Sequence, residues 1–386
     1  MIEAAYFYQQ LLKNGAGFFS GVPDSLLKSF CAYLTDYAGE ENHIIAANEG
    51  GAVALAAGFH LATGKIPLVY MQNSGVGNAV NPLLSLADSD VYRIPLILLI
   101  GWRGEPGVKD EPQHIKQGKV TCSLLEAMDI PYAVLSGGEG EAERQITACF
   151  RHIRKNSSPY ALVVRKDAFA AGELQGNRDP PAAPELTREE AIETLITAPS
   201  ENEVYVATTG MASRELYELR EKHRQGHERD FLTLGSMGHA SSLAMGAALE
   251  GHSVTCIDGD GALLMHLGSL AAIGVRRPRR FRHILINNGA PDSVGGQPTI
   301  APGIDLAGMA KAAGYGGVYS VKSGEELRRV LEGLEGSAGG GEREGPVFIE
   351  VKVRKGARKD LGRPGLSPAE NKAAFMGYLA KRRNHW

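Results

Sequence analysis

Residues 254–289 read VTCIDGDGALLMHLGSLAAIGVRRPRRFRHILINNG, and this stretch decides the fold. One apolar run ends at Gly259-Asp260-Gly261, a helix-like segment follows, and a second run ends at Asn287-Asn288, which is the pattern of a strand–helix–strand unit. The carboxyl ends of parallel strands bind ligands in α/β sheets, and a helix that begins there offers N–H groups to a phosphate. We therefore expect Asp260 and Asn287 on adjacent strand ends, as carboxylate and amide ligands of a Mg²⁺ ion. Either motif alone is typical of a turn, whereas the two together favour a cofactor site.

The same alternation of apolar strand and helix extends over most of the 386 residues and predicts an α/β fold of two doubly wound parallel-sheet domains. The strand candidates are GFFSG, HIIAA, IPLVYM, RIPLILLIG, YAVL and YALVV in the first half, and EVYVATT, DFLTLG, SVTCID, FRHILIN, GVYSV and PVFIEVKV in the second. We place the first domain at 1–168, a Pro- and Gly-rich linker at 169–186, the second domain at 187–355 and a helical tail at 356–386. Thr187 and Glu190 have the spacing of a capping box at the start of the second domain.

The composition excludes several classes of protein. With a formal net charge of −3 the chain has no broadly basic face, so nucleic acid is not an expected partner. No apolar run is long enough to cross a bilayer, and the N-terminus lacks the pattern of a signal peptide. The four cysteines are widely spaced and fit neither a disulfide framework nor a zinc cluster. We therefore expect a cytoplasmic protein without a membrane partner. The local run from Arg276 to Arg282 is expected to form a solvated loop between a helix and a strand, with a contact between subunits as the alternative.

Candidate functional residues in the first half follow strand ends. Glu49 begins a small-residue helix, where a carboxylate either favours the helix N-terminus or serves chemistry at a buried edge. Asp24 and Ser25 follow the first strand, where helix capping would also explain the aspartate. The segment MQNSGVGNAVNPLLSL, which contains Asn73, lacks the complete Gly-x-Gly-x-x-Gly of dinucleotide sites and so weakens a dehydrogenase interpretation. The polar loop IGWRGEPGVKDEPQHIKQGK carries several cationic side chains and one histidine. This composition is typical of a loop that covers an anionic substrate, and an ordinary surface loop is the alternative. Its candidates are Arg103, Lys109 and His114.

In the second half, Thr209 follows a strand and Met237 lies in a tight Gly-Ser-Met-Gly turn. A bulky apolar residue in such a turn is unusual, because turns are normally built from small and polar residues. Met237 either fills a gap in the core or presents its side chain to a ligand.

With these motifs in place, the chain resembles the thiamin diphosphate-dependent decarboxylases, in particular the group that acts on phosphonopyruvate and sulfopyruvate. The resemblance covers both halves and is most specific in GVPDSLLK, NEGGAVALAAG, QNSGVGNAVNPLLSL, WRGEPGVKDEPQH, TTGMASREL, GSMGHAS, GDGALLMHLGSL and NNGAPDSVGGQPT. It implies two domains of the thiamin diphosphate-binding type, a pyrimidine-binding domain first and a diphosphate-binding domain second. The implied cofactors are thiamin diphosphate and Mg²⁺.

The resemblance also implies roles for individual residues. Glu49 would activate the pyrimidine N1′, and the Mg²⁺ ligands would be Asp260, Asn287 and the carbonyl of Gly289. Met237 would fold the two cofactor rings together, and the remaining cofactor contacts would come from Thr209, Gly235, Gly259, Gly261 and Ala262. Asp24 and His114 would handle protons, and the substrate would contact Ser25, Asn73, Arg103, Lys109 and His114.

The implied reaction is the non-oxidative decarboxylation of 3-phosphonopyruvate, a small anionic 2-oxo acid, to phosphonoacetaldehyde and CO₂ in phosphonate biosynthesis. Decarboxylation of sulfopyruvate is the close alternative. A nucleotide-dependent oxidoreductase and a non-catalytic binding module are distant ones; the first is opposed by the missing dinucleotide motif and the second by the presence of Glu49, Asp260 and Asn287. The resemblance further implies a homodimer or a larger even homo-oligomer, with active sites between subunits.

Overall fold

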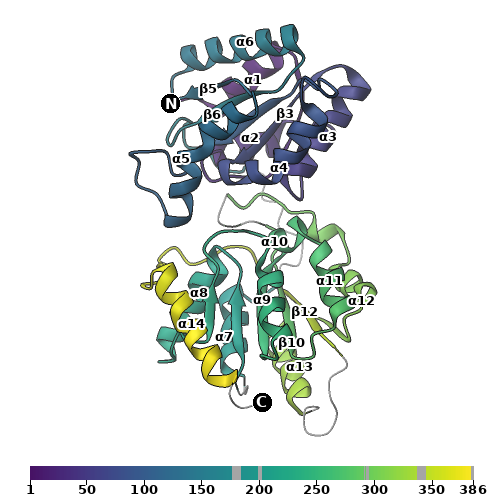
Figure 1. Cartoon of the computed structure of the whole chain (residues 1–386), viewed down its shortest axis with the longest axis vertical. Helices are drawn as coiled ribbons and strands as arrows, with labels where there is room; N and C mark the ends of the chain where they lie inside the picture. Colours follow the sequence, from purple (N-terminus) through teal and green to yellow (C-terminus); the bar gives the residue numbers. More distant parts are fainter. Residues whose placement is uncertain (176–183, 199–201, 291, 293–294, 337–344, 384–386) are drawn as a thin grey trace. The chain divides into compact units, whose positions relative to one another are not determined.

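The computed structural model describes residues 1–175, 184–198, 202–290, 292, 295–336 and 345–383. The chain divides into two compact units, one of Met1–Arg178 with Ser293–Gln297 and one of Asp179–Asp292 with Pro298–Trp386 (Figure 1). Part of the expected linker, residues 176–183, lies outside the described residues. Among the described residues, no helix has both the length and the apolar character that a membrane span requires.

The first unit is built on a six-stranded parallel sheet with the order β2-β1-β3-β4-β6-β5. Its strands are β1 (Ala16–Gly21), β2 (His43–Ile45), β3 (Ile66–Gln72), β4 (Ile97–Gly101), β5 (Tyr132–Leu135) and β6 (Tyr160–Val164). Its helical segments are α1 (Ala4–Lys13), α2 (Lys28–Tyr37), α3 (Glu49–Thr63), η1 (Asn73–Gly75), α4 (Val76–Pro82), η2 (Leu83–Ala87), α5 (Pro112–Ala127) and α6 (Glu139–Asn156).

Helices cover both faces of this sheet. Alternate residues of β3 point to opposite faces: Leu68 and Tyr70 pack with α1, α2 and α6, whereas Val69 and Met71 pack with α3, α4 and α5. Every residue of β4 is buried, which is why the central strands appear in the sequence as continuous apolar runs rather than alternating ones.

The second unit repeats the architecture with the order β11-β12-β10-β9-β7-β8, again all parallel. Its strands are β7 (Val204–Ala207), β8 (Asp230–Leu232), β9 (Val254–Gly259), β10 (Phe281–Asn287), β11 (Gly317–Val321) and β12 (Val347–Lys352). Its helical segments are α7 (Arg188–Thr197), α8 (Met211–Lys222), α9 (Ala240–Leu249), α10 (Asp260–Met265), α11 (Gly268–Arg276), η4 (Ala301–Gly303), α12 (Leu306–Ala313), α13 (Gly324–Gly336) and α14 (Pro368–Arg383). The expected α/β class and all twelve strand candidates are thus confirmed.

Two local expectations have different outcomes. The capping box at Thr187 and Glu190 is present at the start of α7. The expectation that the arginine run is a solvated loop is wrong for its last member, because Arg282 belongs to β10 and is buried. Its guanidinium donates to the buried carboxylate of Glu203 at 2.8 Å and also pairs with Glu335, so the charge is neutralised inside the unit.

The C-terminal helix α14 packs against the strand at one end of the second sheet. The side-chain amide of Asn371 accepts from the backbone N–H of Leu232 at 3.0 Å and donates to the carbonyl of Asp230 at 2.8 Å. Phe375 adds a ring contact with Phe231, with centroids 5.6 Å apart. The tail is therefore part of the second unit.

Candidate active site

Glu49 is the first residue of α3, directly after Asn48, whose side chain caps the helix by accepting from Gly51 N. The Glu49 side chain is buried, and its Oε2 accepts from Asn78 Nδ2 at 2.8 Å. Burial raises the pKa of Glu49, with partial compensation by the Asn78 hydrogen bond. Gly75 makes room for the carboxylate, because a Cβ there would lie 2.3 Å from Glu49 Oε1. The site therefore holds a carboxyl group that is easily protonated, in one fixed position.

Asp24 follows β1 and is fully buried. Its two oxygens accept from Gln72 Nε2 at 2.7 Å and from the backbone N–H of Leu26 at 2.9 Å. Burial raises the pKa of Asp24 despite these hydrogen bonds. Gly101, at the end of β4, leaves space for it, because a Cβ there would be 2.1 Å from Asp24 Oδ2. A second protonatable carboxyl group thus lies at the carboxyl end of the first sheet.

The structure brings together four of the five expected substrate residues. Arg103 Nη1 donates to Ser25 Oγ at 2.8 Å, and the Asn73 amide bonds both backbone groups of Arg103. His114 and Arg103 share one further partner, the carboxylate of Asp110, which the sequence did not single out. Lys109, by contrast, is exposed, and among the described residues it makes no hydrogen bond or ion pair with this group.

In the second unit, the expected metal ligands lie on adjacent strand ends. Asp260 is 3% exposed at the start of α10, directly after β9, and Asn287 ends the neighbouring strand β10. Asn287 Nδ2 donates to Glu350 Oε1 at 2.8 Å, which fixes the amide, and its Oδ1 accepts from Gly289 N at 3.2 Å. Gly289 has a φ of +68°, which favours glycine at this turn.

Thr299 connects the two ends of this motif and was not assigned a role from the sequence. Its hydroxyl donates to Asp260 Oδ2 at 2.5 Å, and its backbone N–H donates to Gly289 O at 2.8 Å. Burial raises the pKa of Asp260 to about 6, although the Thr299 hydrogen bond opposes the shift. The carboxylate is costly to ionise here in the absence of a cation.

Met237 lies beside the first residues of α10. A Cβ on Gly261 would be 3.6 Å from Met237 Cε and 3.7 Å from Thr299 Cγ2, so both side chains border the space above this glycine. Ala262 is buried, whereas Gly235 and Gly259 are half-buried.

The two threonines after β7 differ in their contacts. The hydroxyl of Thr209 donates to the carbonyl of Leu234 at 2.8 Å. The hydroxyl of its neighbour Thr208 is buried and has no hydrogen-bond partner among the described residues. Thr208 Cγ2 would be 3.9 Å from a Cβ on Gly259, so this unsatisfied hydroxyl belongs to a residue that borders the Gly-Asp-Gly turn.

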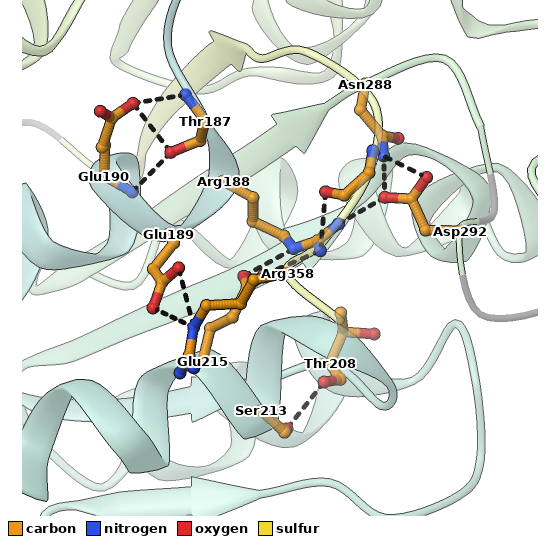
Figure 2. A network of polar contacts seen from close by, with 11 residues as sticks. Thr187, Arg188, Glu189, Glu190, Thr208, Ser213, Glu215, Asn288, Asp292 and Arg358 are labelled. Atoms are coloured by element: carbon orange, nitrogen blue, oxygen red, sulfur yellow. Dashed lines mark hydrogen bonds and ion pairs between the residues drawn. The ribbon is translucent and has the colours of Figure 1, made fainter. Parts of the chain in front are cut away.

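A polar network fixes the segment that follows the metal motif (Figure 2). Asp292 accepts from Arg188 Nη1 at 2.8 Å, from Asn288 Nδ2 at 2.7 Å and from the backbone N–H of Gly356 at 3.2 Å. Arg188 also makes a bidentate pair with the buried Glu215, at 2.7 and 2.9 Å. The start of α7 is thereby tied both to α8 and to the loop after Asn287.

The residues in the second unit fit a Mg²⁺-bound diphosphate. The donors at the strand ends are a carboxylate oxygen, an amide oxygen and the Gly289 carbonyl, all of them the hard oxygen ligands that Mg²⁺ prefers. The raised pKa of Asp260 and the unsatisfied Thr208 hydroxyl are the features expected of a site that a cation and an anion complete together.

Comparisons with known proteins agree with this arrangement. The model of the thiamine pyrophosphate enzyme N-terminal TPP-binding domain matches residues 2–123, and that of the C-terminal TPP-binding domain matches residues 208–351. Fold, site and family models therefore define a thiamine pyrophosphate enzyme.

Similarity to individual proteins narrows this class. A phosphonopyruvate decarboxylase from Streptomyces viridochromogenes is 33% identical over 98% of this chain and 95% of that protein. One from Streptomyces hygroscopicus is 33% identical over 99% of this chain and 95% of that protein. A sulfopyruvate decarboxylase from Methanosarcina acetivorans is 32% identical over 72% of this chain and 74% of that protein. The chain belongs to the phosphonopyruvate decarboxylase family of the thiamine pyrophosphate enzymes, and the expected cofactors, thiamin diphosphate and Mg²⁺, are confirmed at the level of the family.

Proposed function

We propose that this protein decarboxylates 3-phosphonopyruvate to phosphonoacetaldehyde and CO₂, as a step of phosphonate biosynthesis. The observation that carries the proposal is the extent of the similarity, since two phosphonopyruvate decarboxylases match 98% and 99% of this chain. The matched length includes both Glu49 and the pair Asp260 and Asn287, so neither half of the candidate site lies outside the comparison.

The cofactor would be held by two groups of residues. Asp260, Asn287 and the carbonyl of Gly289 would ligate Mg²⁺, and the diphosphate would be held by Thr209, Gly259, Gly261 and Ala262. Thiamin diphosphate, when bound, supplies the attacking carbon and the electron sink for loss of CO₂. Glu49 would hold a proton at the pyrimidine N1′, a role that suits a buried carboxyl group whose pKa is raised. Met237 would support the folded cofactor, and the carbonyl of Gly235 would accept from its amino group.

The substrate would bind beside the first sheet. Arg103 and His114 would contact the phosphonate, with Ser25, Asn73 and Lys109 around them. Asp24 and His114 would handle the protons of the reaction. This role suits Asp24 because its carboxyl group is buried and has a raised pKa. Exclusion of water from such a site would favour loss of the charged carboxylate.

Sulfopyruvate is the second candidate substrate, since the Methanosarcina acetivorans relative is a sulfopyruvate decarboxylase. The two substrates differ chiefly in an anionic head with about two negative charges against about one. The test is CO₂ release from 3-phosphonopyruvate and sulfopyruvate side by side, with thiamin diphosphate and Mg²⁺ added. We expect a higher kcat/KM for phosphonopyruvate; a preference for sulfopyruvate, or no reaction with phosphonopyruvate, would contradict the proposal.

We also propose that the active protein is a homodimer or a larger even assembly, with each active site formed between subunits. Support comes from exposed apolar helix faces: Leu55 and Leu61 of α3 are 38% and 70% exposed, and Leu243 of α9 and Val275 of α11 are 44% and 77% exposed. Surfaces of this kind on a soluble domain mark protein contacts. A symmetric pair of chains would cover these faces and complete the sites.

Subunit mixing tests this assembly. Glu49→Gln and Asp260→Ala proteins should each be inactive, for different reasons, so a mixed dimer with shared sites would regenerate one native site of its two. We expect activity to appear on mixing under subunit exchange, in proportion to the mixed dimer measured by native mass spectrometry. Mixed dimers without activity would show that each site is built within one chain.

We place the protein in the cytoplasm. All four cysteines are free thiols in the structure, and Cys31, Cys149 and Cys256 are buried. A reducing compartment is consistent with unpaired cysteines. Detection of the native protein in a fractionated cell extract would check the location.

A further inference from the structure

The loop between β4 and α5 packs closely against the first half of α5. Trp102 Nε1 donates to Gly118 O at 2.8 Å. Gly104 has a φ of +70°, and a Cβ there would be 1.9 Å from the carbonyl oxygen of His114. A Cβ on Gly118 would be 1.7 Å from Gly104 O, so backbone lies directly on backbone. The side chains of this loop are therefore held in defined positions rather than displayed on a surface tip.

Asp110 accepts five hydrogen bonds with its two carboxylate oxygens. Oδ1 accepts from Arg103 Nη2 at 2.5 Å, from the backbone N–H of Glu111 at 2.7 Å and from His114 Nδ1 at 2.9 Å. Oδ2 accepts from Arg103 Nε and from the backbone N–H of Gly104, both at 2.8 Å. Burial alone would raise the pKa of Asp110, but these donors together hold it well below its ordinary value. The group is an ionised carboxylate and can only accept.

This arrangement determines which nitrogen of the His114 ring carries the proton that faces Asp110. Since Asp110 accepts, the proton between the two groups lies on His114 Nδ1. Nε2 is then the ring nitrogen that faces a ligand, and in the neutral ring it accepts a hydrogen bond, such as one from the P–OH of a phosphonate that carries one proton.

The Asp110 carboxylate also determines which edge of the Arg103 guanidinium can bind a ligand. Three of the five guanidinium N–H groups donate to Asp110 and to Ser25 Oγ. One N–H on each of Nη1 and Nη2 remains, and this pair can form a fork toward an oxyanion. The Arg103 side chain retains 20% of its accessible surface, so the guanidinium is not closed off within this unit.

We propose that Asp110 is a positioning residue that presents the outer edge of Arg103 and Nε2 of His114 as one recognition unit for the anionic head of the substrate. Arg103 would donate to the ionised oxygens of this head, and Nε2 would accept from its protonated oxygen. The inference rests on the proposed function, because it takes a phosphonate as that head. Asp110 acts through Arg103 and His114 and makes no contact with the substrate itself.

The test compares Asp110→Ala with Glu105→Ala. Glu105 is a matched control, since it is a buried carboxylate of the same loop that pairs with Arg165 at 2.5 Å and not with Arg103 or His114. The first readout is the tautomer of His114 from ¹⁵N NMR of the imidazole ring, assigned with His114→Gln. The second is the Kd of 3-phosphonopropionate, a phosphonate that lacks the reactive keto group, measured by calorimetry on enzyme loaded with thiamin diphosphate and Mg²⁺.

We expect wild type and Glu105→Ala to show the proton on Nδ1 and the same Kd. In Asp110→Ala the Nε2–H tautomer should gain population, and the Kd should rise by about 10- to 100-fold, as for loss of a hydrogen bond to a charged group. An unchanged tautomer and Kd in Asp110→Ala would overturn the proposal. If that variant fails to fold, Asp110→Asn replaces it: one oxygen becomes an amide donor, so a Kd as tight as wild type would equally overturn the proposal.

The experiment separates this inference from the proposed function. If the wild-type enzyme neither binds 3-phosphonopropionate nor decarboxylates phosphonopyruvate, the proposed substrate is wrong. If it does both and Asp110→Ala matches wild type in tautomer and Kd, the substrate stands and the role of Asp110 is wrong.

Discussion

Replacement of Asp260 by Asn should have opposite effects on the metal-free and the cofactor-bound protein. Burial raises the pKa of Asp260 to about 6, against an ordinary value of 3.8. The difference of about two pKa units corresponds to about 3 kcal/mol. The unfolded carboxyl group ionises as the pH passes 3.8, but the folded one ionises only near 6. In metal-free protein this residue therefore lowers the free energy of unfolding as the pH rises between these values, by up to about 3 kcal/mol above pH 6.

An asparagine cannot ionise, and its amide oxygen can still accept from the Thr299 hydroxyl. Metal-free Asp260→Asn should therefore match wild type near pH 4 and exceed its free energy of unfolding by up to about 3 kcal/mol at pH 7.5. With Mg²⁺ and thiamin diphosphate the order should reverse. Wild type gains stability from bound ligand, by about 4.1 kcal/mol at a thousandfold excess over Kd, which exceeds its metal-free deficit of about 3 kcal/mol. The variant, which lacks the charged metal ligand, gains much less.

Urea unfolding followed by circular dichroism measures both effects, at pH 4 and 7.5, with EDTA or with saturating Mg²⁺ and thiamin diphosphate. Asp90→Asn, in an exposed turn, is the control and should change neither comparison. A metal-free Asp260→Asn protein that is less stable than wild type at pH 7.5 would refute the reasoning. A full ligand-induced gain in the variant would show that Asp260 does not hold the metal.

Three further outcomes are expected. Glu49→Gln should keep the fold and lower kcat by about 10²- to 10⁴-fold, because an amide cannot share the N1′ proton. Hydrogen–deuterium exchange at C2 of the bound cofactor, followed by NMR, should slow in parallel. Exchange as fast as in wild type would contradict the assignment of Glu49. Gly75→Ala should also reduce kcat with a small change in Tm, since a Cβ would lie 2.3 Å from Glu49 Oε1 and displace the carboxylate; unchanged kcat would argue against a fixed position. Arg188→Leu should cost about 3–5 kcal/mol in urea unfolding, because it leaves the buried Glu215 carboxylate without its partner, and a loss below about 1 kcal/mol would contradict this.

Much of the fold could be predicted from the sequence, because parallel strands that are covered by helices on both faces consist of short runs of apolar residues. The run from Ile97 to Gly101 shows no polar alternation, and all five residues are buried. The candidate residues at strand ends were also accessible to prediction, because the carboxyl edge of such a sheet gathers them. Asp260 and Asn287 end up on neighbouring strands for this reason.

The residues that organise the site could not be predicted in the same way. Asp110 lies in a polar loop with several other charges, and only the folded loop shows that its oxygens receive Arg103 and His114. Thr299 is 39 residues from Asp260 in sequence, so no local pattern indicates their hydrogen bond. Arg282 was grouped with its arginine neighbours for a similar reason, since its partner Glu203 is 79 residues away.

The contact of Asn371 with β8 has a consequence for handling the protein. β8 is the last strand of its sheet, and such an edge presents N–H and C=O groups that can pair with a strand of another molecule. The Asn371 amide occupies one N–H and one carbonyl of this edge, in the manner of a strand one residue long. The C-terminal helix therefore protects this edge against edge-to-edge aggregation, so a shortened version of the protein should keep α14.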